Sequence, residues 1–385
     1  MRRREMLGAV LGAAWRPAVL RIEWREGPEY PMGIQDSAFA MLNGKTVSAG
    51  GFTRHPKDVL ATYPDVFEGK KSGFTKATFV FDPAREKSGW TRIADLPGPA
   101  RQGAAAVTVG KALYVIGGFN YDPPHCYRGA YRLEQKGANW FWSKLDADLP
   151  WPLCESGAAV IGSKIFLVAA ADFCAPPGTK DQDFSVVGRG SDPVGRALLE
   201  LDTANLHAGW KRLADLPGTP RFDTCAAAVA GKIYVLSGVH RDTREKSAGY
   251  ANVVDSWCYH PSLARWFPLP DMPHISNQRA VAWRDRNLIL VGNYRYRFTR
   301  RPDGRIEDVY TPEERTMDWK QFFGAKVMVF DAKTNRLFET DPLLDRTSLP
   351  MAAIAGDTVY TLGGEGGTRL WHPATFQIGR IRQAQ

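Results

Sequence analysis

Short apolar stretches that end in small residues recur along the chain, and they predict many short strands rather than long helices. Residues 89–98 read GWTRIADLPG and return almost unchanged at 209–218 as GWKRLADLPG. After each copy come an apolar stretch rich in alanine, a Gly-Lys turn and a second apolar stretch that ends in a small pair. Repetition of this kind is typical of proteins that stack one supersecondary unit many times.

The small pair locates the unit six times. The pairs are Gly50-Gly51, Gly117-Gly118, Ala169-Ala170, Ser237-Gly238, Gly292-Asn293 and Gly363-Gly364. A variable loop and a third strand follow each pair, and a fourth strand carries an aromatic residue: Trp90, Trp142, Trp210, Trp266, Phe338 or Phe376. A four-stranded sheet cannot bury both of its faces alone, whereas six sheets around an axis bury one another. We therefore predict an all-β, six-bladed propeller with four antiparallel strands per blade, formed as a single domain by residues 19–385.

The two ends of the chain offer one more strand than the six units need. Residues 20–24 and residues 376–381 both have the pattern of a fourth strand. Pairing the first and last segments of the chain would remove the sheet edges that an open ring exposes. We favour the N-terminal segment as the strand that completes the last blade.

Polar residues stand where the first strand of each unit begins. Because neighbouring strands are antiparallel, the first strand begins on the side where the second one ends. These residues and the loops after the small pairs therefore border one central mouth. We assign six of them to substrate binding: Asp36, Arg101, Glu155, Arg221, Gln278 and Arg346. The long loops 52–76, 171–196 and 294–325 leave from the same face, as insertions on the binding side of repeat proteins do. The alternative is that these loops only cover the ring.

The loop after the last pair is short and rich in glycine, so its backbone can approach a ligand closely. It holds a carboxylate and a guanidinium four residues apart, Glu365 and Arg369. The first can transfer a proton and the second can hold an anion through two parallel hydrogen bonds. The alternative is an ion pair on the surface.

Several of these features resemble the Kelch repeat. They are the Gly-Gly pair, the downstream tryptophan and the Leu-Pro turn, over about residues 30–380. Within Kelch proteins, three segments resemble the bacterial sialic acid mutarotases, also called N-acetylneuraminate epimerases, and their cyclically permuted relatives. The segments are residues 32–52, residues 316–331 and the Gly-Glu loop from Gly363 to Arg369.

This resemblance implies an isomerase that exchanges the anomers of an acidic sugar such as sialic acid by acid/base-catalysed ring opening, with neither a cofactor nor a metal. It places the catalytic pair at Glu365, as base or acid, and Arg369, as the partner of the substrate carboxylate. His125 and His240 follow small pairs and can be the complementary proton carrier, because histidine titrates near neutrality. The alternative for both is an ordinary polar loop residue.

Composition adds limits to this picture. The chain has 385 residues, 44% of them hydrophobic and 24% charged, which excludes disordered, collagen-like and coiled-coil proteins. The net charge of +9 is mild, so we expect neither nucleic acid nor a membrane as partner. A small-molecule carbohydrate is the partner that the resemblance implies. No apolar stretch approaches the roughly 20 residues that span a bilayer. A protein partner stays open.

The cysteines and the N-terminus bear on the compartment. The five cysteines show no CxxC spacing, which argues against a zinc site or a thioredoxin-like pair. Cys126 and Cys174 would pair only after export, and reduced buried thiols are the alternative. Arg3-Arg4 and the apolar residues 7–15 resemble a twin-arginine export signal. We therefore expect residues 1–18 to be a leader and the protein to be periplasmic or exported, or else a flexible start of a cytoplasmic chain.

Two other classes of function stay open. A non-catalytic Kelch module would bind glycan or protein through its loop face, with Tyr121, Tyr294 and Tyr296 as aromatic platforms. A copper enzyme of the galactose oxidase kind needs tyrosine, histidine and a tyrosine-linked cysteine around the metal. The inner strands show no such constellation.

Overall fold

The computed structural model describes residues 20–53, 73–122, 124–171, 194–241, 249–366 and 373–383. The expected leader, the loop residues 54–72 and 172–193 and the segment that holds Arg369 lie outside the described residues. In the described part, strands dominate and the helical elements are short 3-10 turns, which confirms the predicted all-β class. No helix in this part is long and apolar enough to cross a membrane.

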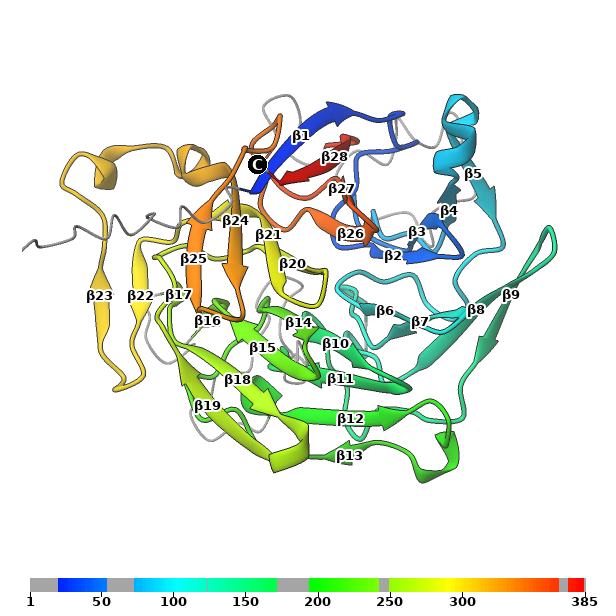
Figure 1. Cartoon of the computed structure of the whole chain (residues 1–385), viewed down its shortest axis with the longest axis horizontal. Coiled ribbons are helices and arrows are strands. Elements are labelled where there is room, and N and C mark those ends of the chain that lie inside the picture. Colours follow the sequence, from blue (N-terminus) through cyan, green and yellow to red (C-terminus); the bar gives the residue numbers. More distant parts are fainter. Residues whose placement is uncertain are drawn as a thin grey trace, which may run out of the picture.

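The described strands form seven four-stranded sheets (Figure 1). Six of them are antiparallel throughout and follow one another along the chain. The first sheet consists, from the inner to the outer strand, of β2 (Ala38–Leu42), β3 (Lys45–Ala49), β4 (Thr78–Phe81) and β5 (Trp90–Ile93). The second consists of β6 (Ala105–Val109), β7 (Ala112–Ile116), β8 (Ala130–Lys136) and β9 (Asn139–Lys144). The third consists of β10 (Gly157–Ile161), β11 (Lys164–Val168), β12 (Leu198–Asp202) and β13 (Lys211–Arg212).

The next three sheets repeat this order. The fourth consists of β14 (Cys225–Val229), β15 (Lys232–Leu236), β18 (Ser256–His260) and β19 (Arg265–Leu269). The fifth consists of β20 (Arg279–Trp283), β21 (Asn287–Tyr294), β24 (Phe323–Asp331) and β25 (Arg336–Glu339). The sixth consists of β26 (Met351–Ala355), β27 (Thr358–Leu362), β28 (Phe376–Gln383) and β1 (Leu20–Glu26). The inner strands contact one another in the cyclic order β2, β6, β10, β14, β20, β26 and back to β2. The arrangement is that of a propeller (Figure 1).

A seventh sheet lies outside this pattern and was not predicted. It is formed by loop segments, β16 (Val239–Arg241), β17 (Tyr250–Val253), β22 (Phe298–Arg300) and β23 (Ile306–Asp308). Strands β17 and β22 are parallel and come from the loops of two successive sheets. Two loops that the sequence shows only as variable in length are therefore joined into one structure.

The N-terminal strand β1 completes the last sheet, as we favoured. It pairs antiparallel with β28 over its whole length, from Leu20 opposite Gln383 to Glu26 opposite Gln377. Our prediction that Phe376 marks a fourth strand is wrong. Phe376 lies on the third strand β28, because the fourth position is filled by β1, which supplies Trp24 as the outer aromatic residue.

Five tryptophans on or next to the outer strands join neighbouring sheets. Each indole N–H donates a hydrogen bond to a backbone carbonyl in the turn that follows the outer strand of the neighbouring sheet. The pairs are Trp24 to Asp341 at 3.1 Å, Trp90 to Pro28 at 3.1 Å, Trp142 to Ala94 at 2.9 Å, Trp210 to Ala147 at 3.0 Å and Trp266 to Ala214 at 2.8 Å. The polar end of each ring is thereby satisfied while its apolar body packs between sheets.

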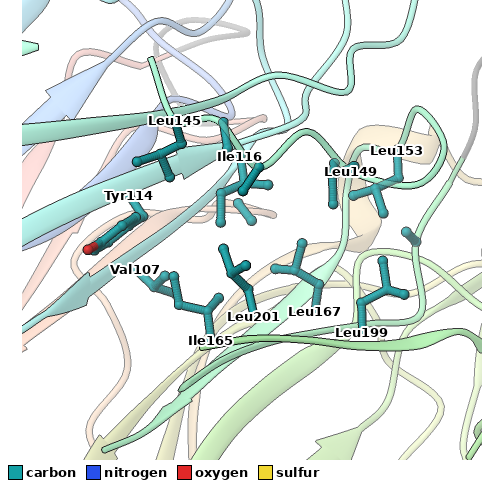
Figure 2. Close-up of a cluster of buried hydrophobic side chains, with 14 of the residues drawn as sticks. Val107, Tyr114, Ile116, Leu145, Leu149, Leu153, Ile165, Leu167, Leu199 and Leu201 are labelled. Atoms are coloured by element: carbon teal, nitrogen blue, oxygen red, sulfur yellow. The ribbon is translucent and has the colours of Figure 1, made fainter. Parts of the chain in front are cut away.

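Apolar side chains of adjacent sheets interdigitate to form the core. Figure 2 shows the layer between the second and third sheets, where Ile116 and Leu149 on one side face Leu167 and Leu201 on the other. Similar clusters lie between other neighbours, including one that holds Ile22 of β1 against Val281 of β20 and Val329 of β24. The N-terminal strand therefore contributes to the core as well as covering an edge.

This position of β1 predicts an effect on stability. The Ile22 side chain is 1% exposed, so Ile22→Ala should lower the free energy of unfolding by about 2–5 kcal/mol. Glu23 is the next residue and faces solvent, and its ion pair with Arg382 is exposed, so Glu23→Ala should change it by less than about 0.5 kcal/mol. Urea titration followed by tryptophan fluorescence measures both. Equal stabilities of the two variants would contradict the docking of β1.

Candidate active site at the hub

Six equivalent residues surround the axis, one at the start of each sheet, and we call them the hub positions. They lie two residues before each inner strand: Asp36, Gly103, Glu155, Asp223, Asn277 and Leu349. All six have a left-handed backbone, with φ between 48° and 62°. Backbone hydrogen bonds link neighbours, since Gly103 N donates to Asp36 O, Glu155 N to Gly103 O, Asp223 N to Glu155 O and Leu349 N to Asn277 O at 2.7–3.0 Å.

Arg279 gathers the three acidic hub residues. It is the first residue of β20, and its Nη2 lies 3.3 Å from Asp36 Oδ1 and 3.5 Å from Glu155 Oε2. Its Nη1 lies 3.1 Å from Asp223 Oδ1. One guanidinium of the fifth sheet thus faces carboxyls from the first, third and fourth sheets. The three carboxyl residues are at most 7% exposed, so their charges are poorly screened by water.

The cluster carries more acid than base, which determines its protonation. Burial, reinforced by Asp223 and opposed by Arg279, raises the pKa of Asp36 to about 7. Burial, together with Asp223 and Asp36, raises the pKa of Glu155 well above its usual value. Burial disfavours the charged form of Arg279, but Asp223, Asp36 and Glu155 outweigh it and raise the pKa of the guanidinium. The hub therefore holds carboxyl protons near neutral pH beside a permanent cation.

A cavity of about 130 Å³ lies along the axis at this level. Asp36, Glu155 and Arg279 line it together with small residues of the inner strands, such as Ala105, Gly157 and Ala226. At about 30 Å³ per water molecule, it has room for a few waters or for part of a ligand. Gly103 contributes by its lack of a side chain, because a Cβ there would lie 2.3 Å from Glu155 Oε1.

Glu365 lies beside the hub at the start of the last loop. Its backbone pairs with Ser348, the neighbour of the hub residue Leu349, through two hydrogen bonds of 2.9 Å. The Glu365 side chain is half-buried, and its charge contributes to the raised pKa values of Tyr250, Tyr294 and Tyr296, for which burial is the first cause. Asp223 acts on Tyr250 and Tyr296 in the same way. Tyr250 and Tyr296 are therefore near enough to both Glu365 and the hub residue Asp223 for their hydroxyls to be affected by both charges.

The aromatic rings form a continuous wall next to Glu365. The ring centroids of Tyr294 and Tyr296 are 4.7 Å apart, and Tyr296 stacks on Tyr250 at 5.6 Å. Tyr294 also contacts Phe323 at 4.8 Å. The hydroxyl of Tyr296 accepts a hydrogen bond of 3.0 Å from Asn277 Nδ2, which ties the wall to a hub position.

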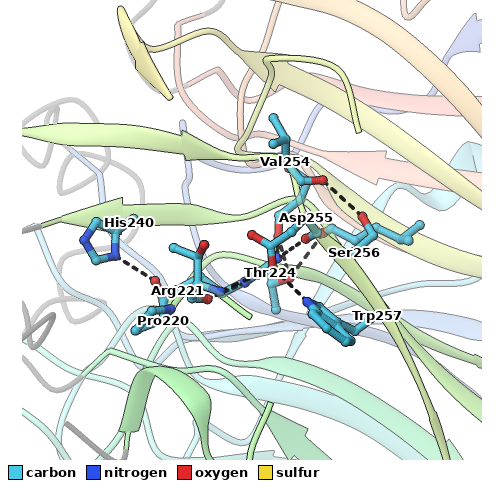
Figure 3. Close-up of polar contacts among 11 residues, drawn as sticks. Pro220, Arg221, Thr224, His240, Val254, Asp255, Ser256 and Trp257 are labelled. Atoms are coloured by element: carbon cyan, nitrogen blue, oxygen red, sulfur yellow. Dashed lines mark hydrogen bonds and ion pairs between the residues drawn. The ribbon is translucent and has the colours of Figure 1, made fainter. Parts of the chain in front are cut away.

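Arg101 and Arg221, which we assigned to substrate binding, are buried within the fold. Figure 3 shows Arg221 beside Asp255. Arg101 donates to the carbonyls of Pro99 and Gly117 at 3.0 Å each. Arg221 donates to Thr219 O at 2.9 Å and Ser237 O at 3.1 Å, and it forms an ion pair with Asp255. In both cases the guanidinium connects the start of an inner strand to the small pair of its own sheet.

The other predicted residues are more scattered. Gln278 is fully buried next to Arg279, and Arg346 is exposed on the turn before Thr347. His125 is half-buried in the loop after Gly118, and the Nδ1–H of His240 donates to Pro220 O at 2.8 Å (Figure 3). Only Asp36 and Glu155 of the predicted binding residues meet in the cavity. Among the residues described, no group of three or more His, Cys, Asp or Glu side chains is arranged to hold a metal ion.

Sequence reasoning missed Arg279 and did not assign Asp223 to the site. Alignment of the six units would have singled out Arg279 as the one charged residue at the start of an inner strand. The other five inner strands begin with small or apolar residues. Those residues are Ala38, Ala105, Gly157, Cys225 and Met351. A guanidinium at that register position must face the axis with a compensating acid opposite.

Comparison with known proteins adds the following. No family profile matches the chain. An N-acetylneuraminate epimerase of Yersinia enterocolitica is 33% identical over 89 residues, and one of Haemophilus influenzae strain PittEE is 37% identical over 89 residues. Each match covers 23% of this chain, which thus spans only 22% of the length of these relatives. The resemblance to N-acetylneuraminate epimerases is confirmed.

A solved structure described as "Structure of YjhT" superposes with a TM-score of 0.61 and covers 93% of this chain and 99% of that one. The sequence identity is 12%, so this likeness shows the fold alone.

The protonation of the hub predicts a pH dependence of stability. The pKa of Asp36 is about 4 in the unfolded chain and about 7 in the folded protein. A carboxyl group with a raised pKa contributes fully to the stability of the native state below the lower value, and this contribution is lost as the pH rises through the higher one. Asp36→Asn should therefore flatten the decrease of the unfolding free energy between these pH values, leaving the part that belongs to Glu155. Urea titrations across the interval measure the slope.

The exposed Asp146→Asn is the matched control and should keep the wild-type slope. A wild-type slope in Asp36→Asn would show that Asp36 titrates as an ordinary surface carboxyl.

Proposed function

We propose that this protein is a mutarotase that exchanges the anomers of an acidic sugar, such as sialic acid, at the mouth of the hub. The observation that carries this proposal is the convergence of the three segments that resemble the epimerase family. Gly364 N donates to Ile34 O at 2.9 Å, and a Cβ on Gly366 would lie 2.5 Å from the Phe323 ring. Segments 32–52, 316–331 and 363–366 thus meet around Glu365, although they are far apart in sequence.

The scaffold of this site is, in our proposal, a closed six-bladed Kelch propeller formed as one domain by residues 19–385. The cyclic contacts of the six inner strands and the pairing of β1 with β28 support a closed ring. The seventh sheet is then an elaboration of the loop face, because its strands come from the loops of the fourth and fifth blades.

The chemistry needs a base and an acid. Ring opening of a cyclic hemiketal removes a proton from the anomeric hydroxyl, breaks the bond between the anomeric carbon and the ring oxygen, and delivers a proton to that oxygen. Glu365 is the proposed base. The hub carboxyls Asp36 and Glu155 bind the sugar and are suited to the acid role, because burial keeps them protonated near neutral pH. Rotation of the open chain and closure on the other face of the carbonyl complete the exchange.

The negative charge of the substrate requires a cation that is not already neutralised. Arg279 is surrounded by three carboxyls, so it is a poor partner for a further anion. Arg369, which the resemblance assigns to the sugar carboxylate, follows Glu365 by four residues and fits this role. We leave Arg101 and Arg221 out of the proposed contacts because their guanidinium groups are engaged by main-chain carbonyls. Gln278, Arg346, His125 and His240 stay predictions.

The role of Glu365 can be tested by substitution. Glu365→Gln keeps the shape of the side chain but cannot accept the proton, so the mutarotation rate should fall about 10²- to 10⁴-fold. NMR of a freshly dissolved sialic acid anomer measures the rate. Glu339→Gln on the outer strand β25 is the matched control, since Glu339 is exposed, and it should act like wild type. An unchanged rate in Glu365→Gln would remove this assignment.

Arg369 should affect binding more than turnover. Arg369→Gln removes a charged hydrogen-bond donor worth about 1.5–3 kcal/mol, so KM for sialic acid should rise roughly 10- to 100-fold. The change in kcat should be smaller, because the carboxylate is bound in both ground and transition states. Exchange rates measured over a range of sugar concentrations separate the two constants. A loss confined to kcat would contradict the clamp.

The aromatic wall favours a second candidate, a non-catalytic module that binds a glycan on Tyr250, Tyr294 and Tyr296. Amphipathic rings of this kind supply contact area at a low cost in conformational entropy. Glycan binding without any change in the anomer ratio would favour this alternative, as would binding that Tyr294→Ala weakens and Glu365→Gln leaves intact.

A further inference from the structure

Two buried thiols meet between the second and third sheets. The Sγ atoms of Cys126 and Cys154 are 3.4 Å apart, and the residues are 2% and 0% exposed. They belong to one apolar cluster with Phe119, Ala171 and Val239. This pairing differs from our prediction from sequence, which coupled Cys126 to Cys174, a residue that lies outside the described part of the chain.

The backbone holds both cysteines in place. Cys126 pairs with Phe119 as an antiparallel bridge, and Cys154 pairs with Ala171 through two hydrogen bonds of 2.9 Å. The neighbours Tyr127 and Leu153 are joined by a hydrogen bond of 3.4 Å from Leu153 N to Tyr127 O. The two segments are therefore side by side, and the close approach of the sulfur atoms follows from the fold.

We propose that Cys126 and Cys154 form a disulfide that covalently joins the second and third sheets beside the hub. The bond requires the sulfur atoms to approach from 3.4 Å to about 2.05 Å, a movement of the order that side-chain rotation provides. Cys225 and Cys258 are also buried, but they lie on strands β14 and β18, which are separated by β15. The proposal does not depend on the sugar chemistry.

The oxidant is a disulfide of low molecular weight, such as oxidised glutathione, or an exchange-active protein disulfide. One protein thiolate attacks the oxidant and releases the first reduced thiol. The second protein thiolate attacks the resulting mixed disulfide and releases the other. The protein loses two electrons and two protons, and the oxidant becomes two thiols.

The bond closes a loop that includes all of β8 and β9 and ends one residue before Glu155. A cross-link over a loop of this length restricts the unfolded chain, so the oxidised protein should unfold at a higher temperature than the reduced one. It also fixes the segment that places Glu155, whose N–H donates to Gly103 O at 2.8 Å.

The test compares the full chain incubated with oxidised glutathione and with dithiothreitol. Because the thiols are buried, each treatment is applied to the folded protein and during refolding from urea. We expect the oxidised sample to lose two hydrogen atoms in intact mass, to yield a cross-linked peptide that contains Cys126 and Cys154, and to melt several degrees higher.

Three single variants make the result specific. Cys126→Ser and Cys154→Ser should abolish both the cross-linked peptide and the shift in melting temperature, while their circular dichroism stays that of the reduced wild type. Cys258→Ser, at a buried cysteine outside the pair, should keep both. A cross-link that runs through Cys174, a glutathione adduct alone, or five reactive thiols after both oxidising treatments would overturn the proposal.

Discussion

The fold depends on how closely the backbones of neighbouring sheets approach one another at the axis. In four of the six small pairs, the second residue donates a hydrogen bond to the chain that enters the next sheet, as Gly51 does to Arg101 O at 2.7 Å and Gly364 does to Ile34 O at 2.9 Å. A Cβ on Gly363 would lie 2.1 Å from that same carbonyl of Ile34, so a side chain there would force the sheets apart. Because the first residue of each pair is also left-handed, glycine satisfies both requirements at once.

The same approach shapes the hub and explains why its chemistry lies there. The chain must turn through a left-handed residue before each inner strand, and aspartate and asparagine adopt that conformation more readily than most other residues. Asp36, Asp223 and Asn277 therefore suit the backbone and also bring polar groups to the axis. Glu155 and Leu349 adopt the conformation at a greater steric cost. A structural demand and a chemical capability thus coincide at these positions.

The balance of charge at the hub sets the protonation of its carboxyl groups. Three carboxyls surround a single guanidinium in a space with little water, and burial favours neutral carboxyls. Among the described residues that line the cavity, Arg279 is the one cation, so the hub holds protons beside a single positive charge. A site of this kind can donate a proton at neutral pH, but its guanidinium is already paired with acidic neighbours and is a poor partner for a further anion. Under the proposed function, the negative group of an acidic sugar would therefore be bound on the loop side of the mouth.

From the sequence alone follow the all-β class, the four-stranded unit and the common face of Asp36, Glu155 and Glu365. These follow from local pattern, since the repeat period, the small pairs and the antiparallel parity are properties of neighbouring residues. The pairing of β1 with β28 was also expected, because it removes exposed sheet edges. Only the folded chain shows that β17 and β22 form a parallel pair and that the guanidinium groups of Arg101 and Arg221 are buried within the fold. It also shows that Cys126 faces Cys154. Each of these depends on which segments distant in sequence are brought together and on where a long side chain finds its partner, and the local pattern carries no information about either.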